Sequence, residues 1–263
     1  MPAPNLSDVR SYWEEHPVAA AAVDEEPGTP EWYEQYDRLR EANESVRYSA
    51  RLHEFADFAG KRVLDVGCGN GYVLSRFARA GARTSGIDLT ARGIDLSRRR
   101  FALEGLPGAF TVGSAEDLPW ADDTFDCVTS MGVLHHTPDT AGAVAEVHRV
   151  LKPGGRLIVM FYHRDSAVYR RLQWRARRSD RPLQELVNEV DGVGNPKGDV
   201  YSREELRALL GAFDDLELSV GFLQGLPFGR FRFPPKALLR PFATRWGWFL
   251  YAKGRKPVLE GRA

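Results

Sequence analysis

A glycine-rich turn, Gly67-Cys-Gly-Asn-Gly71, separates a short apolar run from a segment with helical spacing. Glycines at such a junction let the backbone turn sharply and approach a ligand closely. The spacing differs from the Gly-x-Gly-x-x-Gly pattern of dinucleotide-binding folds, so the turn alone is moderately specific. It indicates a strand, a turn and a helix, with a nucleotide-like or amino-acid-like ligand at the turn.

Short β-rich runs alternate with amphipathic segments through residues 60–162, which is typical of consecutive βαβ units. The expected strands are 62–66, 83–88, 109–113, 125–131 and 156–162. The expected crossover helices, with apolar residues every three or four positions, are 72–80, 90–104 and 140–151. Two later candidates, 216–220 and 248–252, complete a seven-stranded, mostly parallel, doubly wound α/β sheet.

The flanking segments are expected to decorate this one domain. Residues 1–59 carry aromatic and acidic residues at helical spacing and are expected to form an N-terminal helical cap or lid. Residues 60–263 are expected to form the ligand-binding domain, with insertions near 163–200 and 222–247. The N-terminal aromatic residues, among them Tyr12, Trp13 and Trp32, can close over a ligand or pack on the sheet, and both uses can coexist.

The composition is that of a globular protein, with 43% hydrophobic and 27% charged residues. No run approaches about 20 apolar residues, and the first residues lack the layout of a secretion signal. We therefore expect a cytoplasmic protein. The two cysteines, Cys68 and Cys127, have no His or Cys at metal-ligand spacing beside them, so neither a disulfide nor a metal site is implied.

Charge is distributed unevenly along a chain whose formal net charge is zero. Residues 1–60 hold 13 acidic and 5 basic side chains, whereas residues 164–263 hold 19 basic and 12 acidic ones. The two ends can attract each other, or the basic end can meet an anionic partner. Ordinary solvated helix faces explain the same counts, so both interpretations stay open.

Three more features follow later strands, at the edge where open α/β sheets bind ligands. Asp88 ends the second strand, where its carboxylate can accept two hydrogen bonds from ribose hydroxyls. The loop 113–120 follows the third strand and can contact an adenine edge beside Leu89. The Lys-Pro-Gly-Gly sequence at 152–155 ends a helix and leads into the fifth strand.

With these features together, residues 61–162 resemble the class I S-adenosylmethionine-dependent methyltransferase family, in the branch with Leu-His-His after the fourth strand. Dehydrogenases share the broad layout. The compact glycine spacing, the Ala-Glu-Asp-Leu-Pro loop at 115–119 and the Lys-Pro-Gly-Gly turn favour a methyltransferase.

The resemblance implies a Rossmann-like sheet whose last strand is antiparallel, S-adenosyl-L-methionine as cofactor and S-adenosyl-L-homocysteine as product. The cofactor-binding residues that it implies are Gly67, Gly69, Gly71, Asp88, Leu89, Ser114, Ala115, Glu116 and Met131, the last below the sulfonium. Ser114 departs from similar sequences, in which an aspartate often bonds the adenine amino group. The adenine contact is therefore expected to weaken or to pass to Glu116.

Methyl transfer needs an aligned nucleophile and exclusion of water, and no metal is required. A phenol, hydroxyl or acidic carbon also needs a base, and histidine has a suitable pKa near neutrality. Of the six histidines, His135 and His136 follow the fourth strand and His163 follows the fifth, so these are the catalytic candidates. The alternative is that the pair at 135 and 136 holds the next helix without transferring a proton.

The stretch 228–242 interleaves aromatic and cationic residues and is expected to wall an apolar acceptor pocket. It also suits a lipid surface, and it suits nucleic acid least. The expected partner is thus a small-molecule acceptor rather than nucleic acid, with peripheral membrane contact as an alternative. The sequence does not fix the oligomeric state. Two other functions stay open: methylation of a membrane-associated lipid or quinone precursor, and S-adenosylmethionine binding without catalysis.

Overall fold

The computed structural model describes residues 4–17, 23–223, 226–228, 231–233 and 236–258. Side chains in most of the 228–242 stretch lie outside the described part, so its role as a pocket wall stays a prediction. Within the described ranges, no helix has both the length and the apolar character needed to cross a bilayer.

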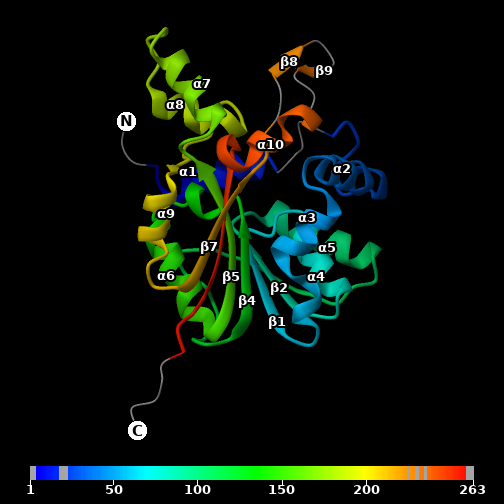
Figure 1. The fold of residues 1–263 in the computed structure, drawn as a ribbon. Coiled ribbons are helices and arrows are strands. Elements are labelled where there is room, and N and C mark those ends of the chain that lie inside the picture. Colours follow the sequence, from blue (N-terminus) through cyan, green and yellow to red (C-terminus); the bar gives the residue numbers. More distant parts are fainter. Residues whose placement is uncertain (1–3, 18–22, 224–225, 229–230, 234–235, 259–263) are drawn as a thin grey trace.

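The core is a twisted sheet with the strand order β3-β2-β1-β4-β5-β10-β7 (Figure 1). These strands are β1 (Arg62–Val66), β2 (Arg83–Asp88), β3 (Ala109–Val112), β4 (Phe125–Met131), β5 (Leu151–His163), β7 (Asp214–Gly221) and β10 (Phe249–Arg255). Neighbouring strands from β3 to β5 are parallel, whereas β10 is antiparallel to both β5 and β7. The predicted seven-stranded, mostly parallel sheet with an antiparallel last strand is confirmed.

Two details of the sheet were not predicted. A short strand, β6 (Val200–Tyr201), pairs with the carboxyl end of β5. In addition, β5 begins at Leu151 rather than at residue 156. Its pairing with β4 shifts register between Phe125 and Cys127, and Gly154, at φ 75°, donates its N–H to the carbonyl of Lys256. The Lys-Pro-Gly-Gly sequence at 152–155 is therefore a bulge within β5.

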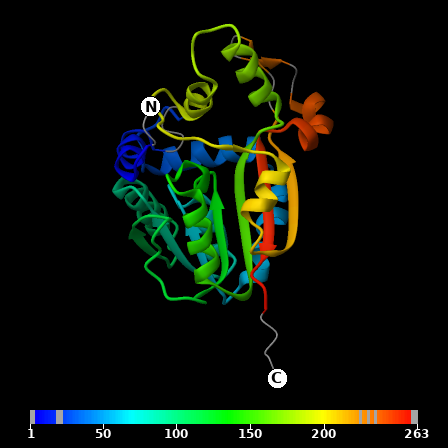
Figure 2. The same ribbon diagram turned by 90° about the vertical axis from the view of Figure 1, so that its left-hand side faces the viewer.

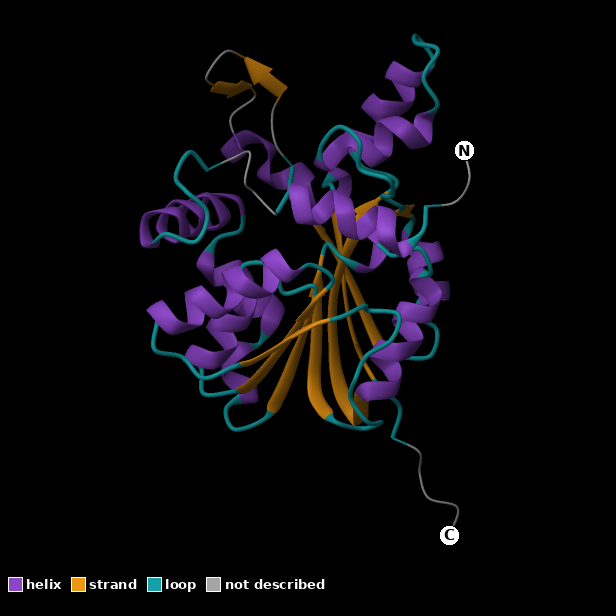
Figure 3. Ribbon diagram, turned by 180° about the vertical axis from the view of Figure 1, so that it is seen from behind, coloured by secondary structure: helices purple, strands orange, loops and turns teal. Residues whose placement is uncertain are grey.

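Helices cover both faces of the sheet (Figure 3) because strand side chains alternate between two apolar cores. Val63 and Ile158 face one core with α4 and α5, whereas Leu64 and Leu157 face the other with α6 and α9. The helices after β1 are α4 (Tyr72–Arg79), α5 (Ala91–Leu103), α6 (Thr140–Val150), α7 (Ala167–Ala176), α8 (Leu183–Asn188), α9 (Arg203–Leu209) and α10 (Lys236–Trp246). The 3-10 turns are η1 (Phe55–Phe58), η2 (Leu134–His136) and η3 (Glu189–Asp191).

The N-terminal segment divides into two parts with different surroundings. Helices α2 (Pro30–Asn43) and α3 (Val46–His53) pack into the core, where Trp32 is fully buried. Arg100 of α5 also makes a two-pronged ion pair with Asp37. Helix α1 (Leu6–Glu15) instead crosses above the carboxyl ends of the strands (Figure 1).

The two views in Figures 1 and 2 place α1, α7, α8 and α10 above this edge of the sheet. The β8-β9 hairpin (Leu226–Phe228 and Phe231–Phe233) lies on the same side. The chain leaves the sheet after β10 at the opposite edge. The insertions predicted near 163–200 and 222–247 therefore extend over one edge, above the ends of the parallel strands.

Candidate functional site

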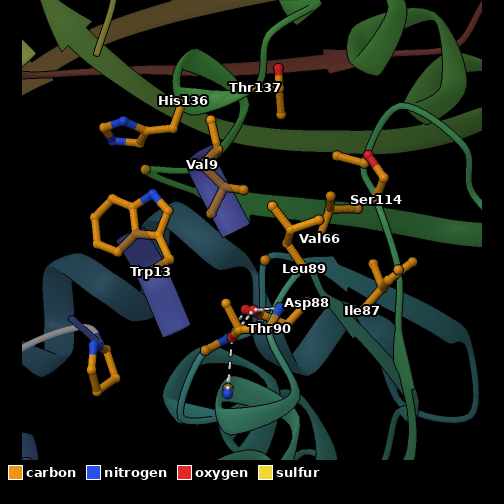
Figure 4. A pocket seen from close by; sticks show the side chains of 18 of the residues that line it. Val9, Trp13, Val66, Ile87, Asp88, Leu89, Thr90, Ser114, His136 and Thr137 are labelled. Atoms are coloured by element: carbon orange, nitrogen blue, oxygen red, sulfur yellow. Dashed lines mark hydrogen bonds between the residues drawn. The ribbon is translucent and has the colours of Figure 1, made fainter. Parts of the chain in front are cut away.

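A pocket opens at the carboxyl ends of the first four strands, beneath α1 (Figure 4). It spans about 860 Å³ of space, part of it open to solvent. Sequence-distant segments contribute its lining: α1, the glycine turn, and the residues that follow β2, β3 and β4. Of the predicted cofactor residues, those in the lining are Gly67, Gly69, Asp88, Leu89, Ser114 and Ala115.

The glycine turn follows β1 and has the backbone that only glycine adopts readily, with φ of 75° at Gly67 and 52° at Gly69. A Cβ atom on Gly67 would lie 2.3 Å from Cγ2 of Val133. Gly71, at φ 76°, starts α4 and lies outside the pocket lining. Gly67 thus lets the turn pack directly against Val133, and Gly71 leads into the helix.

Asp88 ends β2 and links three parts of the pocket wall. Its Oδ2 accepts the N–H of Gly69 at 2.9 Å, while its Oδ1 accepts the N–H and the hydroxyl of Thr90 at 2.9 and 2.6 Å. Burial raises the pKa of Asp88, and the bonds from Thr90 and Gly69 oppose that shift. Each carboxylate oxygen has two lone pairs, and Oδ1 uses both for Thr90, so Oδ2 is the oxygen that keeps a lone pair for a ligand hydroxyl.

Of the two predicted cofactor residues in the loop after β3, Ser114 lies in the pocket lining and Glu116 does not. Ser114 lines the pocket, and its Oγ accepts the N–H of Glu116 at 3.1 Å. The Glu116 carboxylate instead accepts the N–H of Asp139 at 2.8 Å and lies outside the lining. Glu116 therefore ties this loop to the start of α6, because that main-chain donor lies within its reach.

The end of β4 also differs from the expectation. Met131 packs against the core and is absent from the pocket lining, where Gly132 and Val133 stand instead. Gly132 has φ 77°, which turns the chain away from the strand direction. The residues that contact this part of the pocket are thus the two that follow the predicted methionine.

Helix α1 closes the pocket from above with Leu6, Val9 and Trp13. The carboxylate of Glu14 accepts the N–H groups of Ala91 and Arg92, both at 3.0 Å, at the start of α5. Anionic groups are stabilised at helix N-termini. Helix α1 is therefore attached to the element that follows Asp88.

His136 is the one of the three candidate histidines that lines the pocket. Its ring makes an edge contact with Trp13, with centroids 5.2 Å apart, and Figure 4 shows the two rings together at one end of the pocket. Its Nδ1 bonds the carbonyl of Lys197, and its Nε2 lies 3.6 Å from Oδ2 of Asp191. Burial lowers the pKa of His136, and the charge of Asp191 opposes that shift.

The other two candidates lie behind the pocket wall. His135 is fully buried, packs 4.1 Å from the ring of Tyr162, and has a pKa held well below its ordinary value by burial. His163 bonds the carbonyl of Gly247 through Nδ1 at 3.1 Å and is also buried. Neither belongs to the pocket lining.

Several residues of the site were not predicted. Asn70 lines the pocket, and its buried Nδ2 has no hydrogen-bond partner within the described structure. Asp65 is buried beneath the turn, and burial together with the charge of Asp88 raises its pKa to about 8. Asn70 lies within the glycine-rich turn and Asp65 lies just before it. The polar residues of this segment could therefore have been recognised as site candidates from the sequence. Asp191 lies 55 positions after His136, and nothing in the sequence joins them.

The central part of the chain matches the model of one known family. Residues 64–159 match the model of a methyltransferase domain. The fatty-acid O-methyltransferase of Mycolicibacterium smegmatis is 40% identical over 155 residues, which are 56% of this chain and 54% of that protein. A ubiquinone biosynthesis O-methyltransferase of Thiobacillus denitrificans is 40% identical over 115 residues, 43% of this chain and 50% of that protein. The chain thus spans about half the length of these relatives.

Solved structures share the fold over a longer stretch. The PH0226 protein of Pyrococcus horikoshii superimposes with a TM-score of 0.59 at 20% identity, over 94% of this chain and 98% of its own. The [4+2]-cyclase SpnF gives a TM-score of 0.61 at 22% identity, over 97% of both chains. Since a cyclase has the same fold, chemistry has to be argued from the site.

Proposed function

Because the chain belongs to the class I S-adenosylmethionine-dependent methyltransferases, we propose that it transfers a methyl group from S-adenosylmethionine to an oxygen, nitrogen or carbon nucleophile of a small organic acceptor. One observation carries the proposal. The glycine turn, Asp88 and His136 line a single pocket that α1 closes. Cofactor groups and a side chain able to accept a proton therefore share one enclosed space.

The pocket fits the family's cofactor in two respects. Gly67 and Gly69 line the pocket with bare backbone in the left-handed region, and the buried Nδ2 of Asn70 is a donor with no partner among the described residues. We assign Gly67, Gly69 and Asn70 to the amino-acid part of the cofactor. The nucleoside part is assigned to Asp88 at the ribose and to Leu89, Ser114 and Ala115 around the adenine.

When bound, the cofactor supplies a methyl group made electrophilic by its sulfonium sulfur. The chain's own contribution is to hold the acceptor in line and to keep water out. Leu6, Val9 and Trp13 serve the second task, because they cover the pocket with apolar surface. His136 is assigned to accept the acceptor's proton, since burial keeps its imidazole neutral.

A more specific acceptor is favoured by the apolar character of the α1 side of the pocket. The three α1 side chains and Pro17 offer no charge there, which suits an acceptor with an apolar body. Relatives named for fatty-acid and ubiquinone-biosynthesis methylation support the same class. A membrane-associated lipid or quinone precursor is therefore the second candidate acceptor.

The experiment that tests this function is the formation of S-adenosylhomocysteine from S-adenosylmethionine. Bacterial metabolite extracts, a long-chain fatty acid and an alkyl-substituted catechol serve as separate acceptor sources, with isotope-labelled methyl to identify the product. We expect acceptor-dependent turnover with at least one source. Tight S-adenosylhomocysteine binding with no turnover from any of them would support a cofactor-binding protein without catalysis.

Replacing His136 by alanine should reduce turnover far more than cofactor binding, by about 100-fold, the scale of a general base. Single-turnover rates and titration with S-adenosylhomocysteine measure the two effects separately. His163→Ala is the matched control, because His163 lies outside the pocket lining. Equal losses of rate and affinity in the His136 variant would contradict the base assignment.

A further inference from the structure

Two buried polar atoms, one on the pocket-lining residue His136 and one on Asp191, face each other without a hydrogen-bond partner. Nε2 of His136 and Oδ2 of Asp191 are both among the unpartnered atoms of the described residues, and they lie 3.6 Å apart. Buried polar groups in folded proteins are almost always hydrogen-bonded, so an unpartnered pair calls for a physical reason.

The tautomer of His136 explains why the two atoms do not bond to each other. A carbonyl oxygen can only accept, so the contact with the carbonyl of Lys197 places the imidazole hydrogen on Nδ1. In the neutral ring, Nε2 then presents a lone pair to a carboxylate oxygen, and neither atom can donate. The arrangement lacks one proton, and a proton on Nε2 would complete a charge-assisted contact.

The position of Asp191 is fixed by bonds that leave this oxygen free. Its Oδ1 accepts the hydroxyl of Tyr162 at 2.6 Å, and its main-chain carbonyl accepts the hydroxyl of Tyr12 at 3.1 Å. The next residue, Gly192, has φ 136°, and a Cβ there would lie 2.4 Å from the Tyr12 hydroxyl. Strand β5 and helix α1 therefore both hold the 3-10 turn η3 against His136.

Other titratable groups around the ring do not replace Asp191. Those from the neighbouring elements are Tyr12, His135, Tyr162, Lys197 and Asp199. Lys197 and Asp199 form an ion pair with each other, with Nζ and Oδ2 2.5 Å apart. Burial keeps His135 neutral and raises the pKa of Tyr162 well above its ordinary value. Among the described residues, the charge that faces Nε2 without a pairing cation is that of Asp191.

We propose that Asp191 is the positioning residue that gives His136 its affinity for the proton released by the methyl acceptor. The inference deepens the proposed function and rests on it. As the acceptor atom bonds the methyl carbon, the carbon–sulfur bond breaks and its electron pair stays on sulfur. The acceptor's O–H or N–H bond breaks, and the proton moves to Nε2, where the Asp191 carboxylate stabilises the imidazolium.

The test is an NMR titration of the histidine imidazoles in the full chain, with and without S-adenosylhomocysteine. The His136 resonance is assigned by its loss in His136→Gln. We expect neutral His136 to carry its hydrogen on Nδ1. Asp191→Asn keeps an oxygen for the Tyr162 hydroxyl but removes the charge, so proton affinity at His136 should fall at least about tenfold, a shift of one pH unit.

Two control variants separate this role from packing. Tyr162→Phe loosens the turn but keeps the carboxylate, so the His136 titration should not move to lower pH. Asp199→Asn removes a nearby charge that Lys197 already pairs, so its effect should be well below tenfold. The proposal is overturned if Asp191→Asn shifts His136 no more than Asp199→Asn does, or if neutral His136 carries its hydrogen on Nε2. No acceptor is needed, so failure of the proposed function would appear separately, as absent S-adenosylhomocysteine formation.

Discussion

At the residue scale, the site depends on positions where a side chain would be excluded or a charge is buried. Gly67 combines a left-handed backbone with a Cβ position already occupied by Val133. Asp65 lies beneath it with almost no exposed surface. Gly67 lies in the glycine-rich turn and Asp65 lies just before it. Each residue can be tested by a separate measurement.

Gly67→Ala should weaken S-adenosylhomocysteine binding at least about tenfold, because the new methyl group must displace Val133 as well as accept a strained φ. Gly60→Ala is the matched control: its φ is 73°, but a Cβ there has nothing within 4 Å. That control should lose about 1–2 kcal/mol of stability from backbone strain alone and bind normally. Calorimetric titration and urea unfolding measure both quantities, and equal binding losses would reject a pocket role for Gly67.

Asp65→Asn should change how stability depends on pH. The pKa of Asp65 is about 8 in the fold, against an ordinary value of 3.8, so between these values the folded protein holds a proton that the unfolded chain has released. Stability is therefore lost as pH rises across this window, by up to about 1.4 kcal/mol per pH unit. The asparagine variant should lack that slope in urea unfolding of the cofactor-free protein at pH 5 to 8. Parallel pH profiles would mean that Asp65 is ionised in the fold.

At the element scale, α1 behaves as a cover held at two points. Glu14 caps the start of α5, and Tyr12 bonds the turn at Asp191. None of the α1 side chains belongs to either of the two apolar clusters of the described residues, so α1 is peripheral to the sheet core. Its apolar residues instead face the pocket.

Glu14→Ala should speed release of S-adenosylhomocysteine by about fivefold. Loss of this capping interaction should destabilise the arrangement in which α1 covers the pocket by about 1 kcal/mol. Glu15→Ala is the control, because Glu15 is exposed on the same helix. Stopped-flow displacement gives the release rates. Unchanged release from the Glu14 variant would mean that α1 does not control access to the pocket.

At the scale of the whole molecule, the N-terminal segment is not one cap. Three aromatic side chains of α2, those of Trp32, Tyr33 and Tyr36, belong to the core cluster that also contains Val63 and Phe77. Acidic residues of this segment pair with the main domain, as Glu54 does with Arg156 and Lys253. Part of the excess negative charge of residues 1–60 is therefore paired with basic side chains of the main domain.

Deleting residues 1–17 should leave a cooperative thermal transition but weaken S-adenosylhomocysteine binding. Deleting residues 1–45 should abolish folding, because removal of one large buried aromatic costs about 3–5 kcal/mol and typical domain stability is about 5–15 kcal/mol. Circular dichroism melts compare the two deletions. A folded 1–45 deletion would show that α2 is dispensable to the core.

The sequence alone determined that the chain forms a mostly parallel, doubly covered sheet with a ligand site at the strand ends, because alternating apolar runs and a glycine turn are local signals with a local physical cause. Asp88 and Ser114, predicted from their places at and after strand ends, both lie in the pocket lining. Tertiary structure decided what no spacing encodes: that Glu116 turns to Asp139, that Val133 rather than Met131 meets the pocket, and that Asp191 faces His136. The contacts of Glu116 and Asp191 join separate segments of the chain, which meet only when the loops and the insertion at the strand ends pack in three dimensions.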